Sequence, residues 1–133
     1  MYSKKIQIEA RVMGRMAINH IIPAALAYQT KLLDNVKLMK DVCPDSYESD
    51  AAVALELVRG ISSLVSRIRS QVEEMVEARK AANVLENEYE KARAYHAIAE
   101  RLEAIRKPID KLEEIVDNDV WPLPKYRELL FIN

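Results

Sequence analysis

Glycine and proline are scarce in this sequence of 133 residues, which contains only 2 glycines and 5 prolines. These two residue types supply about 12% of an average protein, and all-β sandwiches and barrels need them at their many turns. An all-β fold is therefore excluded. Cysteine is also rare, because Cys43 is the one cysteine, and this excludes an internal disulfide. No leader with an apolar core and a small-residue cleavage site is visible, so we expect a cytoplasmic setting.

An excess of charge of either sign is also lacking. The sequence has 20 Lys and Arg residues against 21 Asp and Glu residues, for a net charge of -1. A protein that holds a phosphate backbone needs a basic excess, so nucleic acid is excluded as the expected partner. No apolar run is long enough to span a bilayer, so a membrane partner is not expected either. With 50% hydrophobic residues, the chain has enough apolar material to fold.

Apolar residues recur at steps of three and four over three long stretches, which predict helices at about residues 4–41, 50–82 and 88–118. Pro23 and Pro108 lie inside the first and third stretches, and the N–H that proline lacks predicts a kink at each. Helices of similar length joined by short loops predict an elongated antiparallel three-helix bundle over residues 1–119. The predicted fold class is therefore all-α, with long kinked helices and a short C-terminal tail at residues 120–133.

The same spacing predicts two details of the packing. The first stretch has apolar residues along its whole length, which predicts one broad buried face that includes Val12 and Leu26. In the second stretch, Gly60 lies on the same side as Leu57 and Leu64. A glycine inside a helix costs about 1 kcal/mol relative to alanine. We therefore expect Gly60 to allow another helix to cross closely at this position.

The sequence contains no recognisable catalytic, cofactor-binding or metal-binding motif. Neither His20 nor His96 follows a glutamate by three residues, as a di-iron carboxylate site would require. A zinc site is equally unsupported, because there is one cysteine and no histidine pair at the right spacing. Most carboxylates have a Lys or Arg three or four residues away, as on a solvated helix face. We therefore predict that no catalytic, cofactor or metal residues lie in this chain.

The last segment differs from the helices. Its Trp-Pro-Leu-Pro sequence at residues 121–124 must be extended, and large apolar side chains are concentrated around it. Such a tail becomes ordered only by docking on something. The candidate docking residues are Trp121, Leu123, Tyr126, Leu130 and Phe131, and the surface that receives them is expected to be either the bundle itself or a partner.

The same segment resembles a known family. Residues 110–131 contain Asp-Lys-Leu-Glu, then Val-Asp, then Trp-Pro-Leu-Pro-Lys-Tyr and Leu-Leu-Phe, and they resemble the carboxyl end of the type III glutamine synthetases. Upstream, Ile8-Glu9-Ala10-Arg11, Ile21-Ile22-Pro23-Ala24 and Tyr28-Gln29 resemble the helix that follows the catalytic region of that family. The two matches occur in the right order and span nearly the whole chain.

The resemblance implies a parent enzyme that ligates ammonia to glutamate with ATP and divalent metal and assembles into large rings. It also places the catalytic and cofactor-binding residues upstream, so no catalytic residue is carried over to this chain. The implied function is that of a non-catalytic C-terminal helical domain with a structural, assembly or regulatory role. Its implied partners are the upstream catalytic domain and neighbouring subunits. The alternative is a free-standing helical module for protein interaction.

Overall fold

The computed structural model describes residues 2–116, which contain helices and no strand. This confirms the all-α prediction. The elements are α1 (Tyr2–Met16), η1 (Ala17–Ile21), α2 (Ile22–Val42), α3 (Tyr47–Asp50), α4 (Ala52–Asn83) and α5 (Glu88–Ile115). The predicted tail at residues 120–133 and the last residues of the predicted third helix lie outside the described part.

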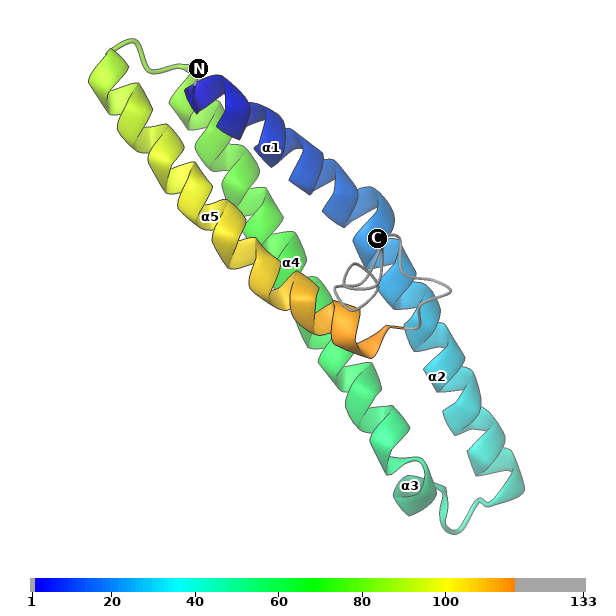
Figure 1. The fold of residues 1–133 in the computed structure, drawn as a ribbon. Helices are drawn as coiled ribbons and strands as arrows, with labels where there is room; N and C mark the ends of the chain where they lie inside the picture. The colour runs from blue at the N-terminus through cyan, green and yellow to red at the C-terminus, as the bar shows by residue number, and fades with distance from the viewer. Residues whose placement is uncertain (1, 117–133) are drawn as a thin grey trace, which may run out of the picture.

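The first helical stretch is one long rod made of α1, η1 and α2 (Figure 1). The element η1 is a π-helix, in which the N–H of Ile22 donates to the carbonyl oxygen of Ala17 five residues earlier. It lies directly before Pro23, at the site where the sequence predicts a kink. A π turn commonly accommodates such a disturbance of the hydrogen-bond ladder. It also inserts a residue into the helical repeat, and this changes the face that the following residues present.

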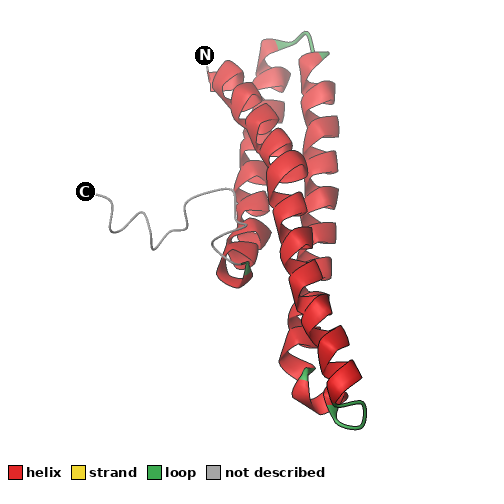
Figure 2. Ribbon diagram, turned by 90° about the vertical axis from the view of Figure 1, so that its right-hand side faces the viewer, coloured by secondary structure: helices red, strands yellow, loops and turns green. Residues whose placement is uncertain are grey.

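The two connections are short. Residues 43–46 and the single turn α3 join α2 to α4, and residues 84–87 join α4 to α5 (Figure 2). The second connection ends at an N-cap, because the side chain of Asn87 accepts a hydrogen bond from the N–H of Glu90 at 3.0 Å. This cap satisfies one of the free donors of the first turn of α5. The helix α5 then continues through Pro108, which is buried.

The helices have unequal lengths, and this divides the molecule into two halves. The helix α5 packs along α4 and α1, whereas α2 packs along α4. Figure 1 shows α5 ending beside the middle of α4, while α2 and α4 continue together to the far end. We call residues 26–60 the two-helix half and the remainder the three-helix half. The helix α4 has 32 residues, and α5 has 28.

The core lies in the three-helix half. It is built from small and branched side chains of α1 and η1, an apolar stripe of α4 and one face of α5. Its buried residues include Ala10, Ala17, Ile21, Ile61, Ile68, Met75, Tyr95, Ile98, Ile105 and Leu112. Between Ala25 and Ile61, only Ala51 is buried.

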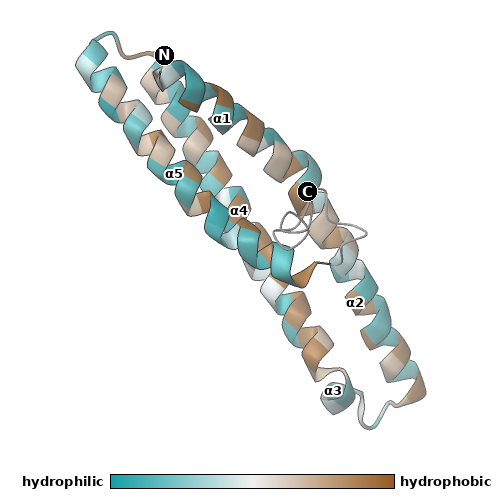
Figure 3. Cartoon of the chain, viewed as in Figure 1, coloured by the Kyte–Doolittle hydropathy of each residue, from teal (hydrophilic) through white to brown (hydrophobic). Residues whose placement is uncertain are grey.

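Two of the predicted packing details differ from the structure. Val12 is 54% exposed and Leu26 is 44% exposed. Val12 lies on the side of α1 away from the buried Ile6 and Ala10, whereas Leu26 follows the π turn and lies in the two-helix half, beyond the end of α5. At Gly60, a Cβ atom added to the backbone would meet nothing within 4 Å. The described residues therefore show no close crossing at this glycine. Hydrophobic residues instead remain visible along α2 and the first turns of α4 (Figure 3).

Candidate functional site

The candidate docking residues predicted from the sequence, Trp121, Leu123, Tyr126, Leu130 and Phe131, all lie outside the described residues. Among the described residues, His20 is exposed on η1, and His96 is exposed on α5 at 3.3 Å from Glu100. Cys43 is half-buried just after α2. These three side chains belong to separate parts of the fold. No group of three or more His, Cys, Asp and Glu residues within residues 2–116 could hold a metal ion.

A cleft of about 460 Å³ lies between α1 and α4 in the three-helix half. Ala10, Gly14, Val72 and Met75 line its inner part, and Val72 and Met75 are buried members of the core. A Cβ atom at Gly14 would lie 3.8 Å from the Cγ1 atom of Val72, which is an ordinary contact distance. The floor of the cleft is therefore apolar and formed by packed side chains.

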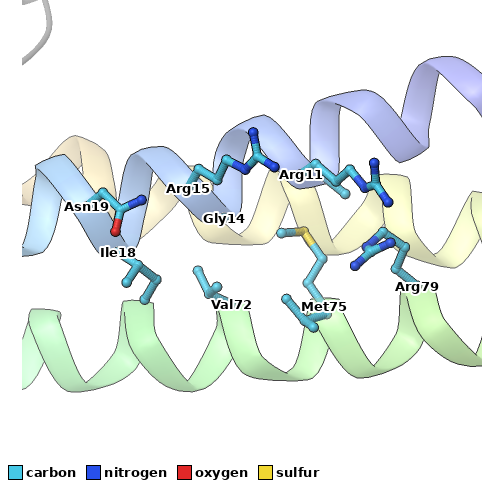
Figure 4. Close-up of a pocket in the computed structure, with 10 residues that line it drawn as sticks. Arg11, Gly14, Arg15, Ile18, Asn19, Val72, Met75 and Arg79 are labelled. Carbon is cyan, nitrogen blue, oxygen red and sulfur yellow. The ribbon is translucent and has the colours of Figure 1, made fainter.

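Three arginines surround this apolar floor. Arg11 and Arg15 come from α1, and Arg79 comes from the facing stretch of α4. Figure 4 shows the side chains of Arg11 and Arg79 extending toward one another from the two helices, and Arg15 lying one turn along from Arg11. We call Arg11, Arg15 and Arg79 with the floor beneath them the arginine cleft.

None of these arginines forms an ion pair within the part of the chain that the structure describes. Other arginines do: Arg69 lies 3.1 Å from Glu73, and Arg101 of α5 lies 3.1 Å from Glu74 of α4. Like charges four residues apart on a helix repel one another, and a third cation from α4 adds to this repulsion. The arginine cleft therefore suits an anionic group, because guanidinium binds carboxylate and phosphate oxygens in pairs.

The exposed surface next to the arginine cleft is apolar. Ile8 is 59% exposed, and Ile18 is 43% exposed. Together with Val12, Arg11 and Arg15 they recur at steps of three and four, so they share one side of the rod. Arginine is enriched at the centre of protein–protein interfaces, and on this helix face it lies beside exposed apolar side chains. We call these five residues the α1 stripe.

Sequence reasoning did not identify this site. The four-residue spacing of Arg11 and Arg15 was the one signal of it in the sequence. Arg79 could not be associated with them from the sequence, because their proximity depends on the register between α1 and α4.

No helix among residues 2–116 combines the length and the apolar character that a membrane span requires.

Comparisons with known proteins agree with the resemblance seen at the two ends of the sequence. The family model described as the glutamine synthetase C-terminal domain matches residues 1–40. A glutamine synthetase of Bacteroides fragilis is 51% identical over 132 residues, which cover 98% of this chain and 18% of that protein. A type-3 glutamine synthetase of Dictyostelium discoideum is 26% identical over 139 residues, with the same two coverages.

The chain thus spans about 18% of the length of the two curated relatives that it matches. Its match to a model of the C-terminal domain indicates which part of such a protein it represents. The family prediction made from residues 8–29 and 110–131 is confirmed. This chain belongs to the glutamine synthetase family and corresponds to its C-terminal domain.

Proposed function

We propose that this chain is a non-catalytic assembly domain of a glutamine synthetase. It binds an acidic surface, which lies either on the ATP-dependent ligase region of the same polypeptide or on a neighbouring subunit. The observation that carries this proposal is the α1 stripe beside the arginine cleft. It combines exposed apolar side chains with arginines that have no carboxylate partner among residues 2–116. A partner surface with Asp or Glu residues would neutralise these cations and cover Ile8 and Val12.

The lining of the arginine cleft does not suit the metal ion of the parent reaction. Transfer of a phosphoryl group from ATP requires metal ions held by fixed carboxylates and cations placed around the phosphates. The arginine cleft offers guanidinium groups, but no Asp or Glu side chain lines it. A magnesium ion that accompanies ATP would therefore find no carboxylate ligand from the side chains that line this cleft. We assign ATP, metal and the ligase reaction to the rest of the parent, and we place the domain in the cytoplasm with that enzyme.

Charge reversal in the full-length synthetase tests the assembly role. The double variant Arg11→Glu with Arg79→Glu puts two carboxylates where the proposed acidic partner would lie. We expect the intact assembly, measured by mass photometry, to fall by at least tenfold at a concentration where the unaltered enzyme is fully assembled. The matched control is Arg67→Glu with Lys107→Glu, which makes the same change in charge at exposed positions outside the arginine cleft.

The control variant should assemble like the unaltered enzyme. If the Arg11 and Arg79 variant also assembles normally, the arginine cleft is not an assembly contact and the proposal is wrong. Circular dichroism of the isolated chain with the same two substitutions separates loss of contact from loss of fold. An unchanged helical signal is expected, because Arg11 is exposed and Arg79 is only half-buried.

A further inference from the structure

We propose that residues 117–133 of this chain dock along the two-helix half and take the place that α5 leaves empty beside α2 and α4. The receiving surface contains Leu57 and Gly60 of α4 and Tyr28 and Leu32 of α2. This inference concerns the internal packing of the chain and does not depend on the proposed assembly role.

The apolar stripe of α4 continues past the end of α5. Ile61, Ile68 and Met75 are buried, and steps of three and four lead from Ile61 back to Leu57 and Ala54. Leu57 and Ala54 are only half-buried. The helix therefore presents the same face along its length, but the neighbour that covers this face is missing over its first turns.

The facing side of α2 behaves in the same way. Ala25 is buried, and the positions three, seven and fourteen residues later are Tyr28, Leu32 and Met39. All three are half-buried, and Tyr28 and Leu32 pack against the edge of the core. The two helices thus form a continuous apolar surface that begins where the three-helix core ends.

Gly60 gives an independent indication that something approaches α4 here. A glycine in the middle of a helix is unfavourable unless close approach of another group requires it. The described residues place nothing within 4 Å of a Cβ atom at this position, whereas Leu57 and Leu64 on the same side are half-buried. The space above Gly60 is therefore open in residues 2–116 and is suited to a segment that lies close to the backbone.

The position where α5 ends makes the following residues the natural occupant. The N–H of Val116, which is buried, donates to the carbonyl oxygen of Leu112 at 2.8 Å, and Figure 1 shows this end of α5 beside the middle of α4. Beyond Ala25, α2 extends for roughly 25 Å at about 1.5 Å per residue. Residues 117–133 reach roughly 55 Å when extended at about 3.3 Å per residue. The segment is long enough to follow the whole two-helix half.

The composition of the segment matches the surface. Trp121, Leu123, Tyr126, Leu130 and Phe131 are large and apolar, and such side chains bury well against half-exposed Leu, Tyr and Met residues. Pro122 and Pro124 favour an extended backbone, which can lie flat against the small residues Ala54 and Gly60. We therefore infer that the segment packs lengthwise and that the bulky side chains fill the space between α2 and α4.

The test uses the full chain of residues 1–133 and the fluorescence of Trp121, which is its one tryptophan. We expect blue-shifted emission that acrylamide quenches poorly and that does not change on hundredfold dilution. The variant Gly60→Met fills the open space above α4 and should shift the emission to the red and increase quenching several-fold. The matched control Ser66→Met adds the same side chain at an exposed position that lies about 120° around α4 from Gly60 and should leave the emission unchanged.

Three results would overturn the inference. Red, freely quenched emission from the unaltered chain would show that the segment does not dock on this chain. Blue emission that is lost on dilution would assign the surface to a second copy. The third result is blue emission that persists in both Gly60→Met and Leu57→Asp, while circular dichroism shows that both variants are fully helical. This result would place the docking site elsewhere on the chain.

Discussion

Gln29 joins α2 to α4 through a hydrogen bond to the main chain of Val58. The side-chain Nε2 atom of Gln29 donates to the carbonyl oxygen of Val58 at 2.8 Å and also to the Oγ atom of Ser62 at 2.8 Å. The contact lies at the boundary between the two halves, where the described residues bury little apolar surface. A polar bridge therefore contributes to holding α2 against α4 at the point where the third helix ends.

Removal of this bridge should destabilise the chain. We expect Gln29→Ala to lower the free energy of unfolding by about 1 to 2 kcal/mol, since each hydrogen bond contributes about 0.5–1.5 kcal/mol. Ser62→Ala removes only one of the two acceptors and should cost less than half as much. Urea unfolding followed by circular dichroism measures both values. Equal stability of Gln29→Ala and the unaltered chain would show that the bridge contributes nothing.

A truncation in the core should have a larger effect. Ile68 is fully buried on α4, and removing several methyl groups from such a position leaves a cavity. We expect Ile68→Ala to cost about 2–5 kcal/mol. Leu38 is 63% exposed on α2, so Leu38→Ala should change stability by no more than about 0.5 kcal/mol. Similar losses in the two variants would contradict the assignment of the core to the three-helix half.

One substitution should stabilise the chain. The Oε1 atom of Gln71 on α4 is buried and has no hydrogen-bond partner within the described structure. A buried acceptor without a partner costs about 1–3 kcal/mol, and methionine has a similar shape without that acceptor. We therefore expect Gln71→Met to raise the midpoint of thermal unfolding and the free energy of unfolding by about 1 kcal/mol. A lower midpoint would indicate that the amide oxygen has a partner after all.

Removal of the C-terminal segment should also affect stability. If residues 119–133 dock on the two-helix half, a chain that ends at Asn118 should lose several kcal/mol, because each large buried side chain contributes about 1.5–3 kcal/mol. The expected signature is a lower urea midpoint together with a smaller m-value, since less surface becomes exposed on unfolding. Unchanged values for both quantities would mean that the segment does not bury apolar surface on this chain.

Much of the fold was predictable because helical periodicity is a local property. The stripe of Ile61, Ile68 and Met75 could be identified from its steps of seven residues, and these side chains are buried. The all-α class followed from the same pattern. The burial of Leu26 could not be predicted correctly, because it depends on where α5 ends and on how the π turn rotates the rod.

The candidate sites were predictable to different degrees. The motifs at residues 8–29 and 110–131 were sufficient to indicate the family, because they match particular residue types in a fixed order. The arginine cleft was not predictable, since Arg11 and Arg79 come together only through the register of α1 against α4. The open space at Gly60 also required the structure, because periodicity places a residue on a face but does not reveal what covers that face.

Calorimetric titration of the purified chain with ATP and magnesium tests the central claim most directly. A domain that serves assembly and carries no part of the ligase site should give no saturable heat, even though the arginine cleft contains three arginines. The same titration into the full-length synthetase is the positive control and should show binding. A saturable micromolar site on residues 1–133, lost in the variant Arg11→Glu with Arg79→Glu, would contradict the account and make the arginine cleft a nucleotide site.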